Sequence, residues 1–241
     1  MKKTLIIAII SMFFGSFANA EIGLNIGVSA QLGELTAKGE ERNSDSNTNA
    51  ADGVGTQSKT EKALFGTAGF FIEKDLSFLP GRLENIGSKI SIGYDNILHD
   101  IDLGTQSNVR TASLGAAGAT VPAGTNQLNA EVSGFQTIYA QLNITEWLYV
   151  KAGEVTVDVD TRFTKSGVVS NDYGSSHELD GTIYGLGVQH TSDNGMFFRL
   201  EYNSYDIDGK TVVSSGADST LTAVLKDVSG DTGRISIGKA F

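Results

Sequence analysis

The chain has no cysteine among its 241 residues and only two prolines, Pro80 and Pro122. The missing cysteine excludes disulfides, thiolate metal sites and cysteine nucleophiles together. Rare proline beside 29 glycines is typical of a chain made of many strands, because proline cannot donate to a β-ladder. Basic residues are also scarce, with 18 Lys and Arg against 28 Asp and Glu, which argues against nucleic acid as a partner.

Long apolar runs are missing as well. The most apolar stretch, residues 5–14, follows Lys2 and Lys3, and small residues at Ala18 and Ala20 suit a signal-peptidase site. We therefore expect residues 1–20 to be a cleaved signal peptide and residues 21–241 to form one domain. The apolar stretch is shorter than the ~20 residues that a spanning helix needs. A membrane location for the mature chain would require a closed barrel, because only helices and closed barrels satisfy every backbone group in lipid.

The clearest pattern in the sequence is two-residue alternation. From Ile22 to Leu32, apolar residues alternate strictly with small or polar ones. A membrane-crossing strand needs ~9–11 residues, with one apolar face and one polar or small face. Within the strand expected at 147–161 the apolar phase changes near Gly153, which predicts a bulge or a twist there. Seven further strands are predicted near 61–74, 88–99, 130–143, 147–161, 179–190, 196–207 and 230–241.

The connections between these segments alternate between short and long. Short connections are expected at 75–87, around Thr145, and at 191–195, whereas the long ones are rich in Ser, Thr, Asn, Asp and Gly. This predicts an all-β, antiparallel up-and-down transmembrane barrel of eight strands, with short turns at one end and long loops at the other. A soluble β-sandwich also alternates, but it has no reason to separate loop lengths in this way. A ten-stranded barrel is the alternative if one long loop supplies another hairpin. The long connections are 35–60, 100–129, 162–178 and 208–229.

The C-terminal run from Gly233 ends on an aromatic residue, Phe241. It resembles the assembly signal of bacterial outer-membrane β-barrels, in which a terminal Phe and alternating apolar residues are recognised by the barrel-assembly machinery. Ile235, Ile237 and Phe241 would carry that signal, and Lys239 departs from its usual apolar pattern. A long lysine stem can nevertheless lie along lipid while its charge reaches the interface.

The mature chain as a whole is similar to the small barrels of the opacity-protein and outer-membrane-protein-A-like superfamily. The resemblance implies a place in the cell outer membrane among lipid and lipopolysaccharide, with short turns in the periplasm, long loops outside the cell and no cofactor. Aromatic residues gather near the short-turn ends of the predicted strands, where we expect a periplasmic girdle. Its predicted members are Phe70, Phe71, Trp147, Tyr149, Phe197 and Phe198.

Charged residues of both signs fall on the phase opposite to the apolar face. In an eight-stranded barrel the lumen is just wide enough for side chains to fill, and an unpaired buried charge is costly. We therefore expect a paired network that plugs the lumen, formed by Lys89, Arg199, Glu201 and Arg234. Glu73, Asp95, Glu131 and Asn203 are also expected to face inward.

No constellation in the sequence makes a convincing active site. His177 and Glu178 follow two serines, but neighbouring residues of a strand point to opposite faces. Acidic pairs such as Asp100 and Asp102 lack the ligand count of a calcium loop. The expectation is a protein that is not an enzyme and acts through its exposed loops in adhesion, binding of an extracellular ligand or envelope integrity. The alternatives are a narrow porin-like channel and, less favoured, a lipid-modifying enzyme.

Overall fold

The computed structural model describes residues 23–43, 57–80, 84–110, 113–114, 120–121, 124–165, 168–170, 176–213 and 221–241; the predicted signal peptide lies outside these. No helix in these ranges is long and apolar enough to cross a membrane. The elements are β1 Leu24–Asn43, β2 Gln57–Asp75, α2 Glu84–Gly87, β3 Ile90–Ile97, β4 Ile101–Arg110, β5 Ser113–Leu114, β6 Thr120–Val121, β7 Gly124–Asn143, β8 Leu148–Lys165, β9 Val168–Ser170, β10 Ser176–Thr191, β11 Met196–Ile207, β12 Lys210–Val213 and β13 Leu221–Ala240.

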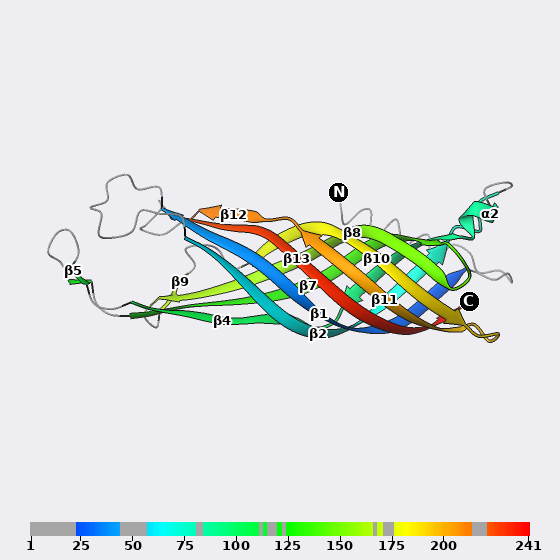
Figure 1. Ribbon diagram of the computed structural model, residues 1–241, viewed down its shortest axis with the longest axis horizontal. Helices are drawn as coiled ribbons and strands as arrows, with labels where there is room; N and C mark the ends of the chain where they lie inside the picture. Colours follow the sequence, from blue (N-terminus) through cyan, green and yellow to red (C-terminus); the bar gives the residue numbers. More distant parts are fainter. Residues whose placement is uncertain are drawn as a thin grey trace.

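Antiparallel pairing runs around the sheet in the order β1, β2, β3, β7, β8, β10, β11 and β13, and β13 pairs back onto β1. The predicted closed barrel of eight antiparallel strands is thus confirmed (Figure 1). Three shorter strands extend this wall at one end: β4 pairs with β7, β9 with β8, and β12 with β13. The predicted loops at 100–129 and 208–229 therefore lengthen existing hairpins and do not widen the barrel to ten strands.

The two ends of the barrel differ. Tight turns close one end, which we call the short-turn end. There Ile144 N–H donates to Leu148 O at 2.9 Å, and Ser192 N–H donates to Met196 O at 2.8 Å. The C-terminus and α2 both lie at this end (Figure 1). At the opposite, hairpin end the strands run farther than predicted: β1 and β2 still pair at Glu41 and Gln57, so their connection starts beyond the limits expected from composition.

The predicted bulge in β8 is wrong. β8 keeps an unbroken register with β10 from Leu148 to Asp160. The apolar phase changes because the surroundings of the strand change: near the short-turn end its apolar residues face outward, whereas Val155 and Val157 turn inward and are buried. Two bulges lie instead on β7 and β4, at Gly134 and Gly104, which have φ angles of 59° and 84°, and the β1–β13 register also shifts between Ala37 and Gly39.

The barrel has an apolar exterior and a filled interior. Toward the hairpin end the lumen holds an apolar cluster: Leu35, Phe65, Ile101, Val132, Phe135, Val155, Val157, Leu179, Ile183, Tyr205 and Ile207. Toward the short-turn end it holds polar and charged side chains. The outward apolar belt includes Ile26, Val28, Leu32, Leu64, Phe70, Leu142, Tyr184, Leu186, Val188, Phe198, Leu200, Tyr202, Ile235 and Ile237.

The close packing of the lumen predicts a contrast between two strand glycines. A Cβ on the inward Gly187 would overlap the ring of Tyr149, whereas a Cβ on the outward Gly233 would meet nothing within 4 Å. Overpacking a filled interior costs about 1–3 kcal/mol. We expect Gly187→Ala to lower the free energy of unfolding by about that amount, and Gly233→Ala to leave it almost unchanged. Denaturant titration in detergent micelles, followed by Trp147 fluorescence, measures both; equal losses would contradict the account of the lumen as a packed interior.

Candidate functional site

The candidate site is the polar section of the lumen, and two-residue alternation builds it. On β11, Phe197, Arg199 and Glu201 are buried inside, while the residues between them are exposed outside. Strand side chains point alternately to the two faces of a sheet. The same alternation on β2, β3, β8 and β13 brings Glu73, Asp95, Lys151 and Arg234 into the same section.

Arg199 and Glu73 form the most completely bonded pair of the site. Arg199 Nη1 and Nη2 donate to Glu73 Oε1 and Oε2 at 2.5 and 2.7 Å, a bidentate geometry. Tyr139 OH donates to Glu73 Oε1 at 2.7 Å, and Asn25 Nδ2 donates to Oε2 at 3.3 Å. Arg199 Nε donates to Gln189 Oε1 at 3.2 Å. One ion pair thereby ties together side chains from five strands.

Three aromatic rings surround the Arg199 guanidinium. Its central carbon lies 4.5 Å from the ring centre of Phe197, 5.3 Å from that of Phe71 and 5.4 Å from that of Tyr149. Cations are attracted to aromatic faces at such distances, more strongly where water is excluded. The rings also fill the space that an eight-stranded barrel leaves around a planar side chain.

This placement corrects half of the predicted aromatic girdle. Phe71, Tyr149 and Phe197 face the lumen because each lies on the inward phase of its strand. Phe70 and Phe198, one position away from two of them, are outward and 39% and 50% exposed. Trp147 is exposed in the turn before β8. Of the six predicted members, Phe70, Trp147 and Phe198 are thus the ones whose exposed position suits a girdle.

A second charged group lies beside the first. Lys151 Nζ is 2.7 Å from Glu201 Oε1, and Arg234 Nε is 3.3 Å from Glu201 Oε2. Arg234 also pairs through Nη1 with Asp95 Oδ2. Lys151 lies over the ring of Tyr139, 5.0 Å from its centre, and so connects the two groups.

The network is balanced in charge: it contains the cations Lys151, Arg199 and Arg234 and the anions Glu73, Asp95 and Glu201. All six side chains are buried. Burying ions is costly unless each has partners that replace water. Equal numbers of both signs, with hydrogen bonds to the ends of most of them, make a neutral plug.

The structure places Arg199, Glu201 and Arg234 inside the lumen, but Lys89 differs from its prediction. Lys89 lies in the turn before β3, where its N–H donates to Ile86 O at 3.1 Å and its side chain is exposed. Lys89 has the same parity as the inward Ser91 and Asp95, but β3 begins only at Ile90, two residues later than predicted, so the alternation does not hold the Lys89 side chain inward. The prediction omitted Lys151, although its position between Val150 and Ala152 on β8 already put it on the inward phase.

Neutral polar side chains lie between the charged network and the apolar cluster. Tyr205 OH donates to Gln31 Oε1 at 3.4 Å. Buried polar atoms of Gln31, Thr67, Asn203 and Thr232 have no protein hydrogen-bond partner. In folded proteins such atoms are commonly matched by ordered water. This layer could therefore be hydrated, as could the unpartnered buried atoms of Gln141, Tyr149 and Ser236 in the charged section.

The residues of the predicted assembly signal lie at the closing seam of the barrel. Ile235 and Ile237 face outward on β13 and are about half exposed. Phe241 N–H donates to Leu24 O at 2.8 Å, and Leu24 N–H donates to Phe241 O at 3.3 Å. Their recognition by an assembly machinery stays a prediction. In the described ranges, no group of three or more His, Cys, Asp or Glu residues could hold a metal ion.

Together, the eight-stranded wall, the outward apolar belt and the filled lumen define a small β-barrel of the outer-membrane type. The solved structures that the chain resembles include the following three. It is 12% identical to Ail, the attachment invasion locus protein of Yersinia pestis, covering 89% of this chain and 99% of that one with a TM-score of 0.33. It is 10% identical to the outer membrane protein OprG from Pseudomonas aeruginosa, covering 92% of this chain and 97% of that one with a TM-score of 0.46. It is also 10% identical to the outer membrane protease OmpT from Escherichia coli, covering 94% of this chain and 99% of that one with a TM-score of 0.41.

No protein-family model and no curated protein sequence matches the chain. The likeness to these structures is one of fold, and it assigns no activity, ligand or residue role to this chain.

The charge balance of the lumen predicts a large effect of removing its shared anion. Glu201→Ala would leave Lys151 and Arg234 with too little negative charge in a buried site, and breaking a buried pair costs about 3–5 kcal/mol. Asp206→Ala on the same strand is the control, because Asp206 faces outward and is exposed. We expect chemical denaturation to show a loss of that size for Glu201→Ala and little change for Asp206→Ala. If Glu201→Ala and Asp206→Ala lowered the free energy of unfolding by similarly small amounts, the network would be hydrated and weakly coupled.

Proposed function

We propose that this chain is a non-enzymatic barrel of the cell outer membrane with a closed lumen, and that it acts through its hairpin end in adhesion, partner binding or envelope integrity. The observation that carries the proposal is the filling of the lumen. Charged and aromatic side chains occupy its short-turn section, and an apolar cluster occupies its hairpin section. A barrel closed in this way offers its outer surface and hairpins, and not its interior, to other molecules.

The exterior supports the membrane assignment. Outward residues such as Val28, Leu186 and Leu200 are between 51% and 63% exposed, which would be unfavourable in water and suits lipid. On β10 the outward residues change from Val188 and Leu186 to Thr182 and Asp180 toward the hairpin end. This change from apolar to polar residues marks the limit of the outward apolar belt on the side of the hairpin end. With the hairpin end outside the cell, the short turns face the periplasm, and outer-membrane lipid and lipopolysaccharide surround the wall.

A narrow channel is the second candidate, favoured by one observation. The layer of neutral polar side chains contains buried atoms without a protein partner, so water could enter the middle of the lumen. Conduction would also require the charged network on one side of this layer to open. This candidate differs from the first in what it requires of the apolar cluster, which would have to open.

Conductance and cell assays separate the two candidates. In planar bilayers we expect the purified wild-type barrel to conduct little or only transiently, because both sections of its lumen are filled.

In cells, we expect a strain lacking the gene to lose adhesion or envelope integrity, with rescue by wild type but not by a variant lacking residues 44–56, between β1 and β2. Heat-modifiable gel migration shows whether that variant assembles. Stable, large conductance of the wild type, together with full rescue by the shortened variant, would favour the channel.

A further inference from the structure

The barrel wall is interrupted between β2 and β4. β3 pairs with β2 up to Ile97, and the last bond of this ladder joins Leu98 N–H to Ala68 O at 3.0 Å. When the chain resumes as β4, it pairs with β7 and not with β2. Within the described residues, the segment 62–67 of β2 thus has a ladder with β1 on one side only. We call the unpaired side of this segment the free edge of β2.

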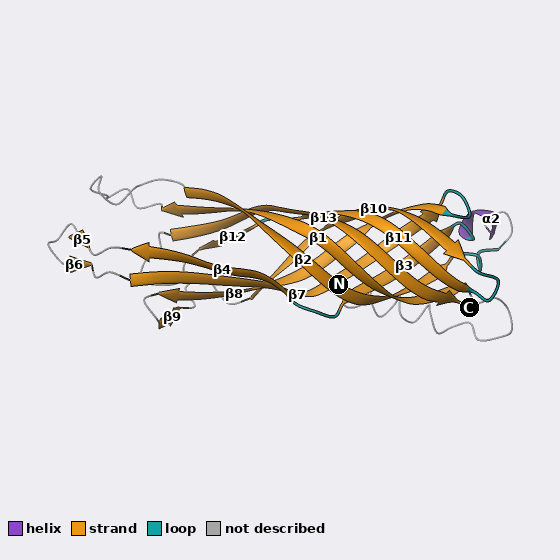
Figure 2. Cartoon of the chain, turned by 60° about the horizontal axis from the view of Figure 1, so that its bottom comes forward, coloured by secondary structure: helices purple, strands orange, loops and turns teal. Residues whose placement is uncertain are grey.

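Two bulges account for the interruption. The register of β4 with β7 shifts between Asp102 and Thr105, and that of β7 with β8 shifts between Ser133 and Gln136. Bulges bend a strand and increase its local twist. At their outer ends β2 and the β4–β7 pair lie apart, so that the wall divides toward the hairpin end (Figure 2).

The free edge presents a defined set of backbone groups. In a strand, the N–H and C=O of one residue point to the same side, and successive residues alternate. Because Ala68 O points toward β3, the N–H and C=O of Gly66, Leu64 and Lys62 point into the interruption. Those of the residues between them point to β1. An unpaired edge of this kind is a template for an additional strand.

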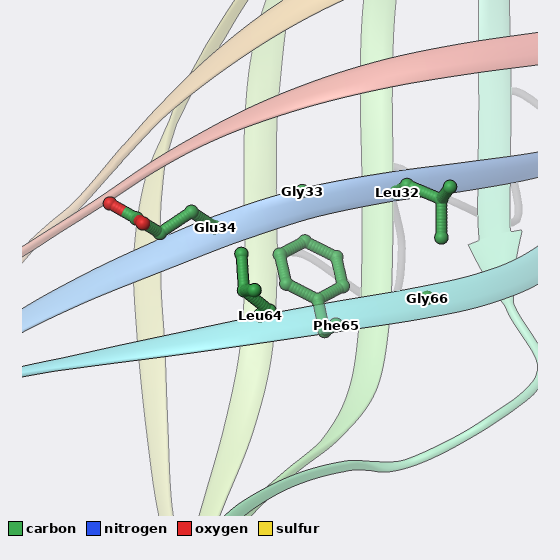
Figure 3. A pocket seen from close by; sticks show the side chains of 6 residues that line it. All are labelled: Leu32, Gly33, Glu34, Leu64, Phe65 and Gly66. Atoms are coloured by element: carbon green, nitrogen blue, oxygen red, sulfur yellow. The ribbon is translucent and has the colours of Figure 1, made fainter.

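Behind this edge, on the paired strands β1 and β2, a shallow open hollow of about 560 Å³ is lined by Leu32, Gly33 and Glu34 of β1 and by Leu64, Phe65 and Gly66 of β2. Leu64 is 83% exposed beside the free edge, and Leu32 of β1, which is 73% exposed, lies over its partner Gly66. Phe65 is buried with 9% exposure, and its ring lies toward β1, beside Gly33 (Figure 3). The ion pair between Lys62 and Glu34, at 2.5 Å, lies at the outer margin of the hollow.

We propose that the free edge of β2 binds an extended polypeptide segment of a protein partner, which adds to the sheet as a strand. Lipid could cover the apolar side chains, but it cannot supply alternating donors and acceptors at strand spacing. Strand addition obtains affinity from main-chain hydrogen bonds and specificity from pockets for alternate side chains. The segment would place an apolar side chain beside the exposed side chain of Leu64. This inference rests on the proposed role in partner binding and names the surface involved.

A proline substitution tests the edge without disturbing the β1 ladder. Leu64→Pro removes an N–H that points into the interruption, and proline is tolerated on edge strands in that orientation. Leu64→Val is the matched control, because it keeps the N–H and an apolar side chain. The probe is a random peptide library displayed on phage and selected on the wild-type barrel in lipid nanodiscs. Heat-modifiable migration establishes that both variants are assembled.

We expect selected peptides to bind Leu64→Pro about tenfold more weakly than wild type, as one lost hydrogen bond implies, and to bind Leu64→Val nearly as well as wild type. In amide exchange experiments, Leu64 and Gly66 should exchange quickly in the free protein and become protected by the peptide. Equal peptide binding to all three proteins, failure to select any peptide, or protection of both amides in the free protein would overturn the proposal. The last result would show that this chain or lipid already covers the edge.

The outcome is independent of the proposed function. If Leu64→Pro loses peptide binding but cells carrying it adhere normally, the edge binds polypeptide while adhesion uses another surface. If the barrel conducts strongly yet peptides bind at Leu64 and Gly66, the closed-lumen function fails and strand addition stands.

Discussion

The bidentate pair of Arg199 and Glu73 is the interaction on which the rest of the lumen depends. A carboxylate in this position has no access to bulk water and needs a cation that can satisfy both of its oxygens. The guanidinium supplies this, and its flat faces are covered by Phe71, Tyr149 and Phe197. Arginine is suited to such a site because it stacks and forms two parallel hydrogen bonds, which lysine does not.

The surrounding residues follow from that pair. Inward glycines such as Gly187 make room for the rings, and small side chains keep the wall close to the plug. The second charged group repeats the same solution around Glu201, with cations from β8 and β13. Farther along the lumen the need for charge pairing ends, and an apolar cluster fills the barrel. The exterior changes at about the same level: the outward apolar belt ends near the point along the barrel where the interior becomes apolar.

Much of this architecture could be predicted from sequence, because a strand in a barrel alternates with period two and turn lengths report its topology. The same period placed Arg199, Glu201 and Arg234 inside. Errors arose where one position decides the face: Phe70 and Phe71 cannot both face outward, and Lys89 falls just before its strand begins. The bulges on β4 and β7 could not be predicted, since a glycine in a strand does not by itself reveal a positive φ angle. The free edge of β2 follows from those bulges and was equally hidden.

A double-mutant cycle between Glu73 and Arg199 tests the central claim most directly. Glu73→Gln, Arg199→Met and the double variant would be compared with wild type by the free energy of unfolding in the same micelles. If the pair is a buried unit that holds the plug together, the two single losses are not additive, and the coupling energy approaches about 3 kcal/mol, the upper end for residues in contact. Single effects that add to within about 0.5 kcal/mol would contradict the claim and indicate a hydrated, weakly coupled lumen.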